Sequence, residues 1–207
     1  MRVAILFERS GKMREAFRAV GCDAYSCDLV PADDRSPFHF TCDYREVLYM
    51  PWDLMVAHPV CTYMTNSAVR WMDGGANVKR MRAMKHAAAV YAEVAGATHI
   101  PKRAIENPVM HRYARAELDR LGVCGTRQVV QPWWFGDPTF KATGFHLFNL
   151  PKLVPTDKLT PPAKGTDEHK AWSWVHRCPP SPDRARIRAE TQPGIARACA
   201  SQWAITG

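Results

Sequence analysis

Short apolar runs alternate with amphipathic stretches along this chain of 207 residues. The apolar runs predict buried β-strands over 2–7, 23–29, 53–58, 103–107, 128–132 and 144–149, with a short edge strand over 38–43. Apolar residues at helical spacing predict helices over 10–21, 78–96 and 111–122, and a last one starting near 193. The alternation predicts an α/β fold with a Rossmann-like, doubly wound and mostly parallel sheet.

Two of the predicted helices have a clear apolar face. These faces are formed by Met13, Phe17 and Val20 in the first helix, and by Val78, Met81, Met84 and Ala88 in the second. The Pro- and Lys-rich stretch 150–164 predicts a loop. The polar segment that follows it, with Trp172 and Trp174, is expected to be irregular.

Length and cysteine usage narrow the class of protein. A chain of 207 residues suits one domain with a substantial core. It has no apolar run near the roughly 18 residues that span a bilayer, and no signal peptide pattern, so a cytoplasmic protein is expected. The seven cysteines lack the paired spacing of a zinc site, so we expect reduced thiols and no bound metal.

The charge of the chain indicates a polyanionic partner. The formal net charge is +8 at pH 7, which favours nucleic acid among the possible partners. The excess is concentrated in three clusters, which are Lys79, Arg80, Arg82 and Lys85; Arg112, Arg115, Arg120 and Arg127; and Arg184, Arg186 and Arg188. A solvated basic surface remains the alternative interpretation of such clusters.

Several polar residues follow predicted strands, where the carboxyl ends of a parallel sheet meet. They are Glu8, Ser10, Gly11, Asp28, Asp43, His58, Cys61, Glu106 and Asn107. Ligands of doubly wound sheets bind at this edge. Gly11 and the N-terminus of the following helix could offer backbone donors to a cofactor. Asp28 could accept from ribose hydroxyls, or it could be a turn former.

Cys61 and Glu106 form the candidate reactive pair. A thiol in a loop near a helix N-terminus can have a lowered pKa, which makes it a nucleophile. Attack on a pyrimidine carbon also needs an acid, and Glu106 suits that role if burial raises its pKa. His58 fits a supporting position better than a metal site, because no further ligands accompany it.

The order of the motifs resembles that of DNA cytosine-5 methyltransferases, especially short phage-encoded members. The motifs are LFERSG, a second strand ending in Asp, PVC, ENP, FGDP and TQPGIARA, and they span nearly the whole chain. The resemblance implies that Cys61 is the nucleophile and that Glu106 and Asn107 hold the cytosine ring. It also implies S-adenosylmethionine as methyl donor, bound by Phe7, Ser10, Gly11, Asp28, Asp43 and Pro59.

The chain departs from the family pattern at the catalytic motifs. Val60 stands where a second proline is usual, and Pro108 where a valine is usual. Thr139, Lys141 and Thr143 replace a glutamine and two arginines. Lys141 could contact the pyrimidine carbonyl as a point charge, without the bidentate geometry of arginine.

A target-recognition domain of the usual size is absent from this sequence. The basic, Pro- and Trp-containing segment 150–189 stands in its place. The residues expected to contact DNA are Thr62, Arg70, Lys152, Lys170, Trp172, Trp174, Arg177, Arg184 and Arg186. Because this segment is short, we expect weak or relaxed sequence specificity, or a helper chain that recognises the target.

Two alternatives remain open at this stage. The same cysteine–glutamate chemistry could act on a free pyrimidine nucleotide, which the missing recognition domain favours. A non-catalytic DNA-binding or interaction protein on the same fold is the other, favoured by Val60 and the missing arginines. The phage-type resemblance points to protection of DNA against restriction nucleases, in the cytoplasm of the host cell.

Overall fold

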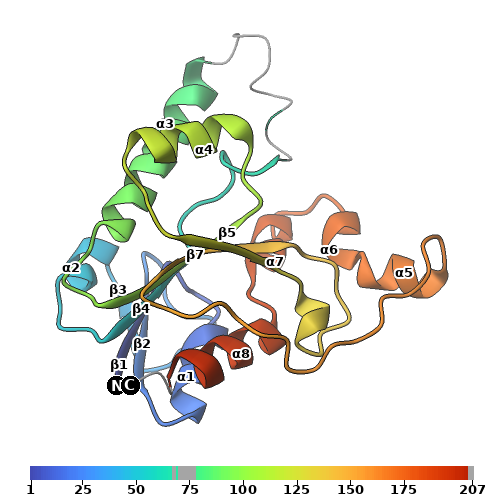
Figure 1. Ribbon diagram of the computed structural model, residues 1–207, viewed down its shortest axis with the longest axis horizontal. Helices are drawn as coiled ribbons and strands as arrows, with labels where there is room; N and C mark the ends of the chain where they lie inside the picture. Colours follow the sequence, from blue (N-terminus) through green and yellow to red (C-terminus); the bar gives the residue numbers. More distant parts are fainter. Residues whose placement is uncertain (67–68, 70–77, 205–207) are drawn as a thin grey trace.

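A computed structural model describes residues 1–66, 69 and 78–204 of the chain. Its centre is a seven-stranded sheet in the order β3-β2-β1-β4-β5-β7-β6 (Figure 1). The strands are β1 (Arg2–Leu6), β2 (Asp23–Asp28), β3 (His39–Thr41), β4 (Leu54–Ala57), β5 (Lys102–Pro108), β6 (Thr126–Val130) and β7 (Thr143–Phe148). The order reverses between β1 and β4, where doubly wound sheets bind ligands.

The strand pairings place the catalytic candidates at one edge. β3, β2, β1, β4 and β5 are parallel neighbours in that order, so their carboxyl ends meet at the same edge. β7 runs antiparallel between β5 and β6, and pairs Glu106 with Phe145 and Asn107 with Gly144.

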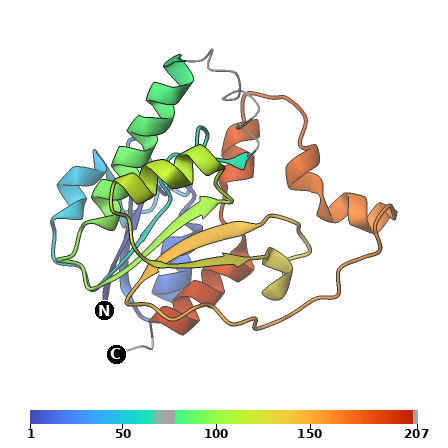
Figure 2. The ribbon, with the colours of Figure 1, turned by 45° about the horizontal axis from the view of Figure 1, so that its top comes forward.

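Helices cover both faces of the sheet (Figures 1 and 2). One layer contains α2 (Tyr44–Leu48), α3 (Val78–Ala95) and α4 (Arg112–Arg120), and the other contains α1 (Lys12–Ala19) and α8 (Pro193–Trp203). Side chains of β1 divide between them, because successive side chains of a strand point to opposite faces. Ala4 and Leu6 pack in the core with α3, whereas Val3 and Ile5 pack in the core with α1.

Three short helices follow the loop 150–164. They are α5 (Asp167–Trp172), α6 (Trp174–Arg177) and α7 (Arg184–Ala189). Thr166 caps α5, because its hydroxyl accepts from the backbone N–H of His169 at 3.1 Å. In both views α5 and α6 project away from the sheet (Figure 2). The expectation of irregular structure here was wrong.

The predicted fold class is confirmed, and the differences are local. α2 and a short 3₁₀ helix, η2 (Pro132–Trp134), were not predicted. Val20 and Val78 are exposed, so neither belongs to the core as predicted. Both lie at helix ends, where the apolar face of the helix extends past the residues that pack on the sheet. Among the described residues, none of the helices combines the length and hydropathy needed to cross a membrane.

Candidate active site

The turns after β1 and β4 and the end of β5 lie side by side, because these three strands are adjacent and parallel. His58 follows β4 directly, and its backbone N–H donates to the carbonyl of Leu6 at 3.0 Å. Cys61 comes three residues later, and Glu106 is near the end of β5. Cys61 and Glu106 therefore lie at the ends of neighbouring parallel strands at the same edge of the sheet, and the charge of Glu106 acts on the Cys61 thiol.

Cys61 occupies a turn and not the start of a helix. Its carbonyl accepts from the backbone N–H groups of Met64 at 2.8 Å and Thr65 at 3.2 Å. Burial raises the pKa of the Cys61 thiol, and the negative charge of Glu106 raises it further, although Lys141 and Arg188 oppose the change. The expectation of a thiol pKa lowered by a helix N-terminus was therefore wrong.

The protonation of Glu106 also differs from the expectation, in the opposite direction to that of Cys61. Burial by itself would raise the pKa of this carboxyl, since only 12% of the side chain is exposed. A hydrogen bond from His58 Nδ1 to Oε2, 3.1 Å long, and the positive charges of His58 and Lys141 outweigh burial. The net pKa of Glu106 is lowered, so the free protein holds a carboxylate and not the predicted acid.

Lys141 brings a positive charge to the pair. Its Nζ donates to the carbonyl of Glu190 at 2.7 Å, and more weakly to that of Ala189 at 3.4 Å. Burial lowers the pKa of Lys141, and the negative charges of Glu106 and Cys61 oppose that effect. The lysine therefore ties the end of α7 to the reactive pair.

Asn107 is buried, and its side-chain amide has no partner. Only 2% of the residue is exposed, and neither Oδ1 nor Nδ2 has a hydrogen bond within the described part of the chain. A buried amide without partners is costly, so a ligand or water is needed to satisfy it. Because neighbouring residues of a strand point to opposite faces, Asn107 lies on the other side of β5 from Glu106.

The turn after β1 is organised by Glu8. Its carboxyl oxygens accept from the backbone N–H groups of Met13 at 2.6 Å and Arg14 at 3.1 Å. The N–H of Lys12 is directed to the Ser10 hydroxyl at 3.4 Å. The donors that a phosphate would need at the start of α1 are therefore taken, contrary to the expectation of free backbone donors there.

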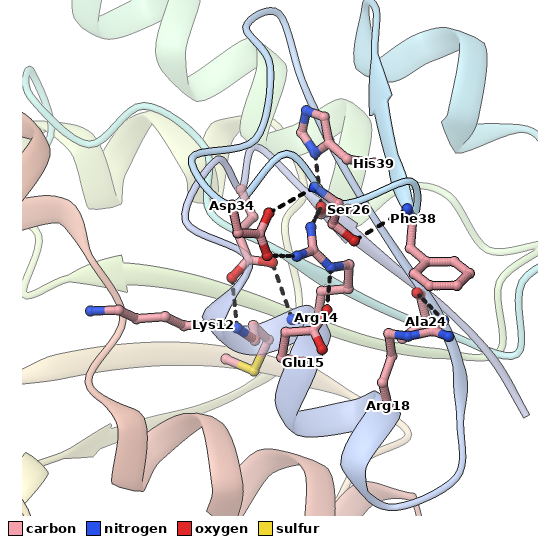
Figure 3. A network of polar contacts seen from close by, with 12 residues as sticks. Lys12, Arg14, Glu15, Arg18, Ala24, Ser26, Asp34, Phe38 and His39 are labelled. Atoms are coloured by element: carbon pink, nitrogen blue, oxygen red, sulfur yellow. Dashed lines mark hydrogen bonds and ion pairs between the residues drawn. The ribbon is translucent and has the colours of Figure 1, made fainter.

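Arg14 fixes this turn against the loop that follows β2 (Figure 3). Its fully buried guanidinium donates to Ser26 Oγ at 2.8 Å and Glu15 at 2.8 Å, and it forms an ion pair with Asp34. Gly11 lies beside it with φ 72°, and a Cβ there would lie 2.8 Å from the Asp34 carboxylate. The network holds the two loops beside the proposed cofactor site.

The other predicted cofactor residues lie near the same edge. Phe7 follows β1, and its ring lies 4.7 Å from that of Tyr44 between centroids. Asp28 ends β2 and accepts from the backbone N–H of Val30 at 3.2 Å. Asp43 caps α2 in a reciprocal arrangement with Glu46. Pro59 is buried and Val60 is exposed.

The residues predicted to contact DNA divide into exposed and engaged groups. Thr62, Lys152 and Arg177 are exposed, and Arg70 lies outside the described residues. Lys170 pairs with Asp167, Arg184 donates to the Cys178 carbonyl, and Arg186 lies near Asp33, Asp183 and Glu190.

The two tryptophans of this group have different settings. Trp172 is buried, with its ring 5.4 Å from that of Phe140 between centroids, so it presents no open stacking surface. Trp174 is partly exposed and donates from Nε1 to Thr139 Oγ1 at 3.0 Å.

Sequence analysis gave Glu8 only a place at the ligand-binding edge and Arg188 only a place in a basic cluster, and it gave Arg14 no role. A charged residue at the end of an apolar run is a signal for Glu8, whereas nothing in the helical pattern marks Arg14 as buried. The interaction of Arg188 with Cys61 arises from tertiary packing of α7.

Comparisons with solved structures agree with the fold. A candidate DNA modification methyltransferase encoded within an E. coli prophage matches with a TM-score of 0.50 and 16% identity, over 77% of this chain and 52% of that one. The Entamoeba histolytica methyltransferase EhMeth matches with a TM-score of 0.52 and 12% identity, over 77% and 57%. The sheet is that of a Rossmann-like methyltransferase fold.

The chain thus spans little more than half the length of these structures. No protein-family model matches the chain, and no curated protein does.

Proposed function

We propose that this protein is a DNA cytosine-5 methyltransferase that transfers a methyl group from S-adenosylmethionine through a covalent Cys61 adduct. The observation that supports the proposal is the position of Cys61 and Glu106 at the ends of the adjacent parallel strands β4 and β5, with the charge of buried Lys141 acting on both. A nucleophile, a ring-nitrogen partner and a cation at one place are the groups that attack on a pyrimidine requires.

The residues after β1 and β2 fit S-adenosylmethionine better than a phosphate-bearing cofactor. Glu8 occupies the donors at the start of α1, which excludes a pyrophosphate from the position it takes in dinucleotide sites. Asp28 at the end of β2 would accept from ribose hydroxyls, and Asp43 at the start of α2 would add a second carboxylate. The bound cofactor would supply an electrophilic methyl group on a sulfonium.

In the proposed reaction Cys61 Sγ attacks C6 of a cytosine turned out of the DNA helix. Glu106 holds a proton at N3 of the ring, and Lys141 stabilises the charge that develops on the carbonyl side. A flipped base costs a few kcal/mol of lost stacking and pairing. After methylation of C5, a base such as water takes the C5 proton, the C5–C6 double bond re-forms and Sγ leaves as the thiolate.

Recognition of the target is proposed to be weak. The segment 150–189 would serve in place of a target-recognition domain, with exposed Thr62, Lys152 and Arg177 available for phosphates. A helper chain that recognises the site is compatible with this arrangement. Protection of DNA against restriction nucleases is the proposed purpose.

The deciding experiment is transfer of labelled methyl groups to DNA, followed by digestion to nucleosides. Duplex DNA, single-stranded DNA and deoxycytidine nucleotides are tested in parallel. We expect 5-methylcytosine with the wild type and with Cys124→Ala, whose thiol is exposed elsewhere, and none with Cys61→Ala. DNA containing 5-fluorocytosine should trap the wild type covalently, because fluorine cannot leave as the proton does. Absence of labelled cytosine in every polymer would reject the proposal.

One observation favours a second candidate, a non-catalytic DNA-binding protein. In the free protein the Cys61 thiol has a raised pKa and Glu106 a lowered one, which is the unreactive combination of the pair. Equal DNA binding by the wild type and Cys61→Ala, with no methyl transfer by either, would establish it. Phosphate contacts would then weaken steeply with salt.

A further inference from the structure

His58 and Glu106 form a buried pair next to Cys61. The Nδ1 atom of His58 lies 3.1 Å from Oε2 of Glu106, and the two side chains are 11% and 12% exposed. An ionised carboxylate can only accept, so the hydrogen of this bond belongs to Nδ1. The backbone bond from His58 N to Leu6 O keeps the ring at this place.

The second nitrogen of His58 has a different environment. Nε2 is buried and has no hydrogen-bond partner within the described part of the chain. Glu8, at the turn after β1, interacts with the charge of His58. The charged and titratable groups that act on the pair are Glu8 from that turn, Cys61 from the turn after β4, Lys141, Tyr91 from α3 and Cys199 from α8.

We propose that His58 supplies the proton that Glu106 presents to the pyrimidine ring. The inference rests on the proposed function and adds a proton source to it. As the Cys61 thiolate bonds to C6, an electron pair moves toward N3 of the ring. Glu106 takes the Nδ1 proton of the imidazolium and passes it to N3, so that His58 ends neutral and Glu106 ends as a carboxylate again. When Sγ leaves, the proton returns along the same path.

The free protein shows why a proton source is needed. The hydrogen bond and charge of His58 outweigh burial and keep the pKa of Glu106 low, so this carboxylate does not carry its own proton. The His58 hydrogen bond is the largest effect that opposes burial at Glu106. Removing His58 should therefore raise the pKa of Glu106. The two roles of His58, donor of a bond and donor of a proton, can therefore be separated by substitution.

The test compares His58→Asn, His58→Ala and a matched control, His86→Asn, whose side chain is exposed on α3. The Asn side chain can keep an N–H near the position of Nδ1 but cannot give up a proton. We expect kcat for methyl transfer at about pH 7 to fall on the order of 100-fold in both His58 variants, the usual size of a general-acid contribution, with KM for DNA nearly unchanged. His86→Asn should match the wild type.

The pH profile distinguishes a proton source from a structural support. In His58→Ala the raised pKa of Glu106 lets that group carry its own proton, so activity should recover as the pH falls. His58→Asn, which keeps the hydrogen bond, should recover less. If His58→Asn is as active as the wild type at every pH, or if both variants lose activity evenly across the profile, the inference is wrong.

A measurement without turnover separates this inference from the proposed function. The carboxyl carbon of Glu106 is titrated by ¹³C NMR in the wild type, His58→Ala and His86→Asn. The midpoint should move upward only in His58→Ala, and an unchanged midpoint would overturn the inference. If the wild type methylates no DNA, the proposed function fails and the proton supply fails with it, while the titration still decides whether the two side chains are coupled.

Discussion

Replacement of Gly194 by alanine tests the contact that joins the FGDP and TQPG motifs. Gly194 is in the first turn of α8, and its N–H donates to Asp137 Oδ2 at 2.7 Å. A Cβ at this position would lie 2.7 Å from that same oxygen and 2.9 Å from the carbonyl carbon of Phe135, and well inside contact distance of the Phe135 oxygen. The obstacle is backbone, so the start of α8 must shift.

The expected loss of stability follows from three contributions. Forcing an extra methyl group into a packed contact costs about 1–3 kcal/mol. Loss of the charge-assisted hydrogen bond adds about 1.5–3 kcal/mol, the lower value being apt because Asp137 is only half-buried. The higher helix propensity of alanine offsets at most about 1 kcal/mol of this loss of stability. The net loss is about 2.5 kcal/mol, or a decrease in Tm of about 5–10 °C for a chain of this size.

Urea unfolding of the purified protein measures this loss. Gly165→Ala is the control, since Gly165 has φ 93° and open space around its Cβ position; it should lose only the conformational cost of about 1–2 kcal/mol. Asp137→Asn keeps an acceptor for Gly194 and should cost about 1 kcal/mol or less. If Gly194→Ala is no less stable than Gly165→Ala, the close approach of α8 to the 135–137 turn is not a constraint.

Three further predictions concern stability and charge. His146 is buried against Tyr91 (2.8 Å from Nδ1 to the hydroxyl), and burial together with the charge of Arg127 lowers the pKa of His146 to about 4. Because the unfolded chain binds this proton near pH 6.5, the free energy of unfolding should fall by up to about 3 kcal/mol as the pH decreases from about 6.5 to 4. Urea unfolding of His146→Gln should lack this decrease. Gly11→Ala should lower the free energy of unfolding by at least about 1–2 kcal/mol, because φ 72° disfavours alanine and the new Cβ would meet the Asp34 carboxylate. It should also weaken binding of S-adenosylmethionine, measured by calorimetry. An unchanged affinity would show that this turn is not part of the cofactor site. Lys141→Met should raise the pKa of Cys61 further, because it removes a positive charge that lowers this pKa. Alkylation of Cys61 by iodoacetamide at a given pH should then slow, as followed by mass spectrometry of the Cys61 peptide. An unchanged rate would exclude the charge interaction.

The local pattern of apolar and polar residues predicts most of the secondary structure of this protein. Continuous apolar runs predict strands such as β1 and β4, since strands covered on both faces need apolar residues at every position. The direction of β7 was not accessible in this way, because strand orientation is set by pairing with β5 and β6. The helices α5 and α6 were missed because their stability depends on packing of Trp172 and Val175, which no local periodicity reveals.

The sequence by itself pointed to Cys61 and Glu106, because both stand at the ends of predicted strands, and the family resemblance added Lys141; the roles of all three stay predictions. Their protonation was decided by the tertiary structure. Burial raises the pKa of Cys61, and His58 lowers that of Glu106, so both differ from what residue type and position along the chain suggested. A pKa depends on the charges and the solvent within a few ångströms, and those neighbours come from separate strands that only folding brings together.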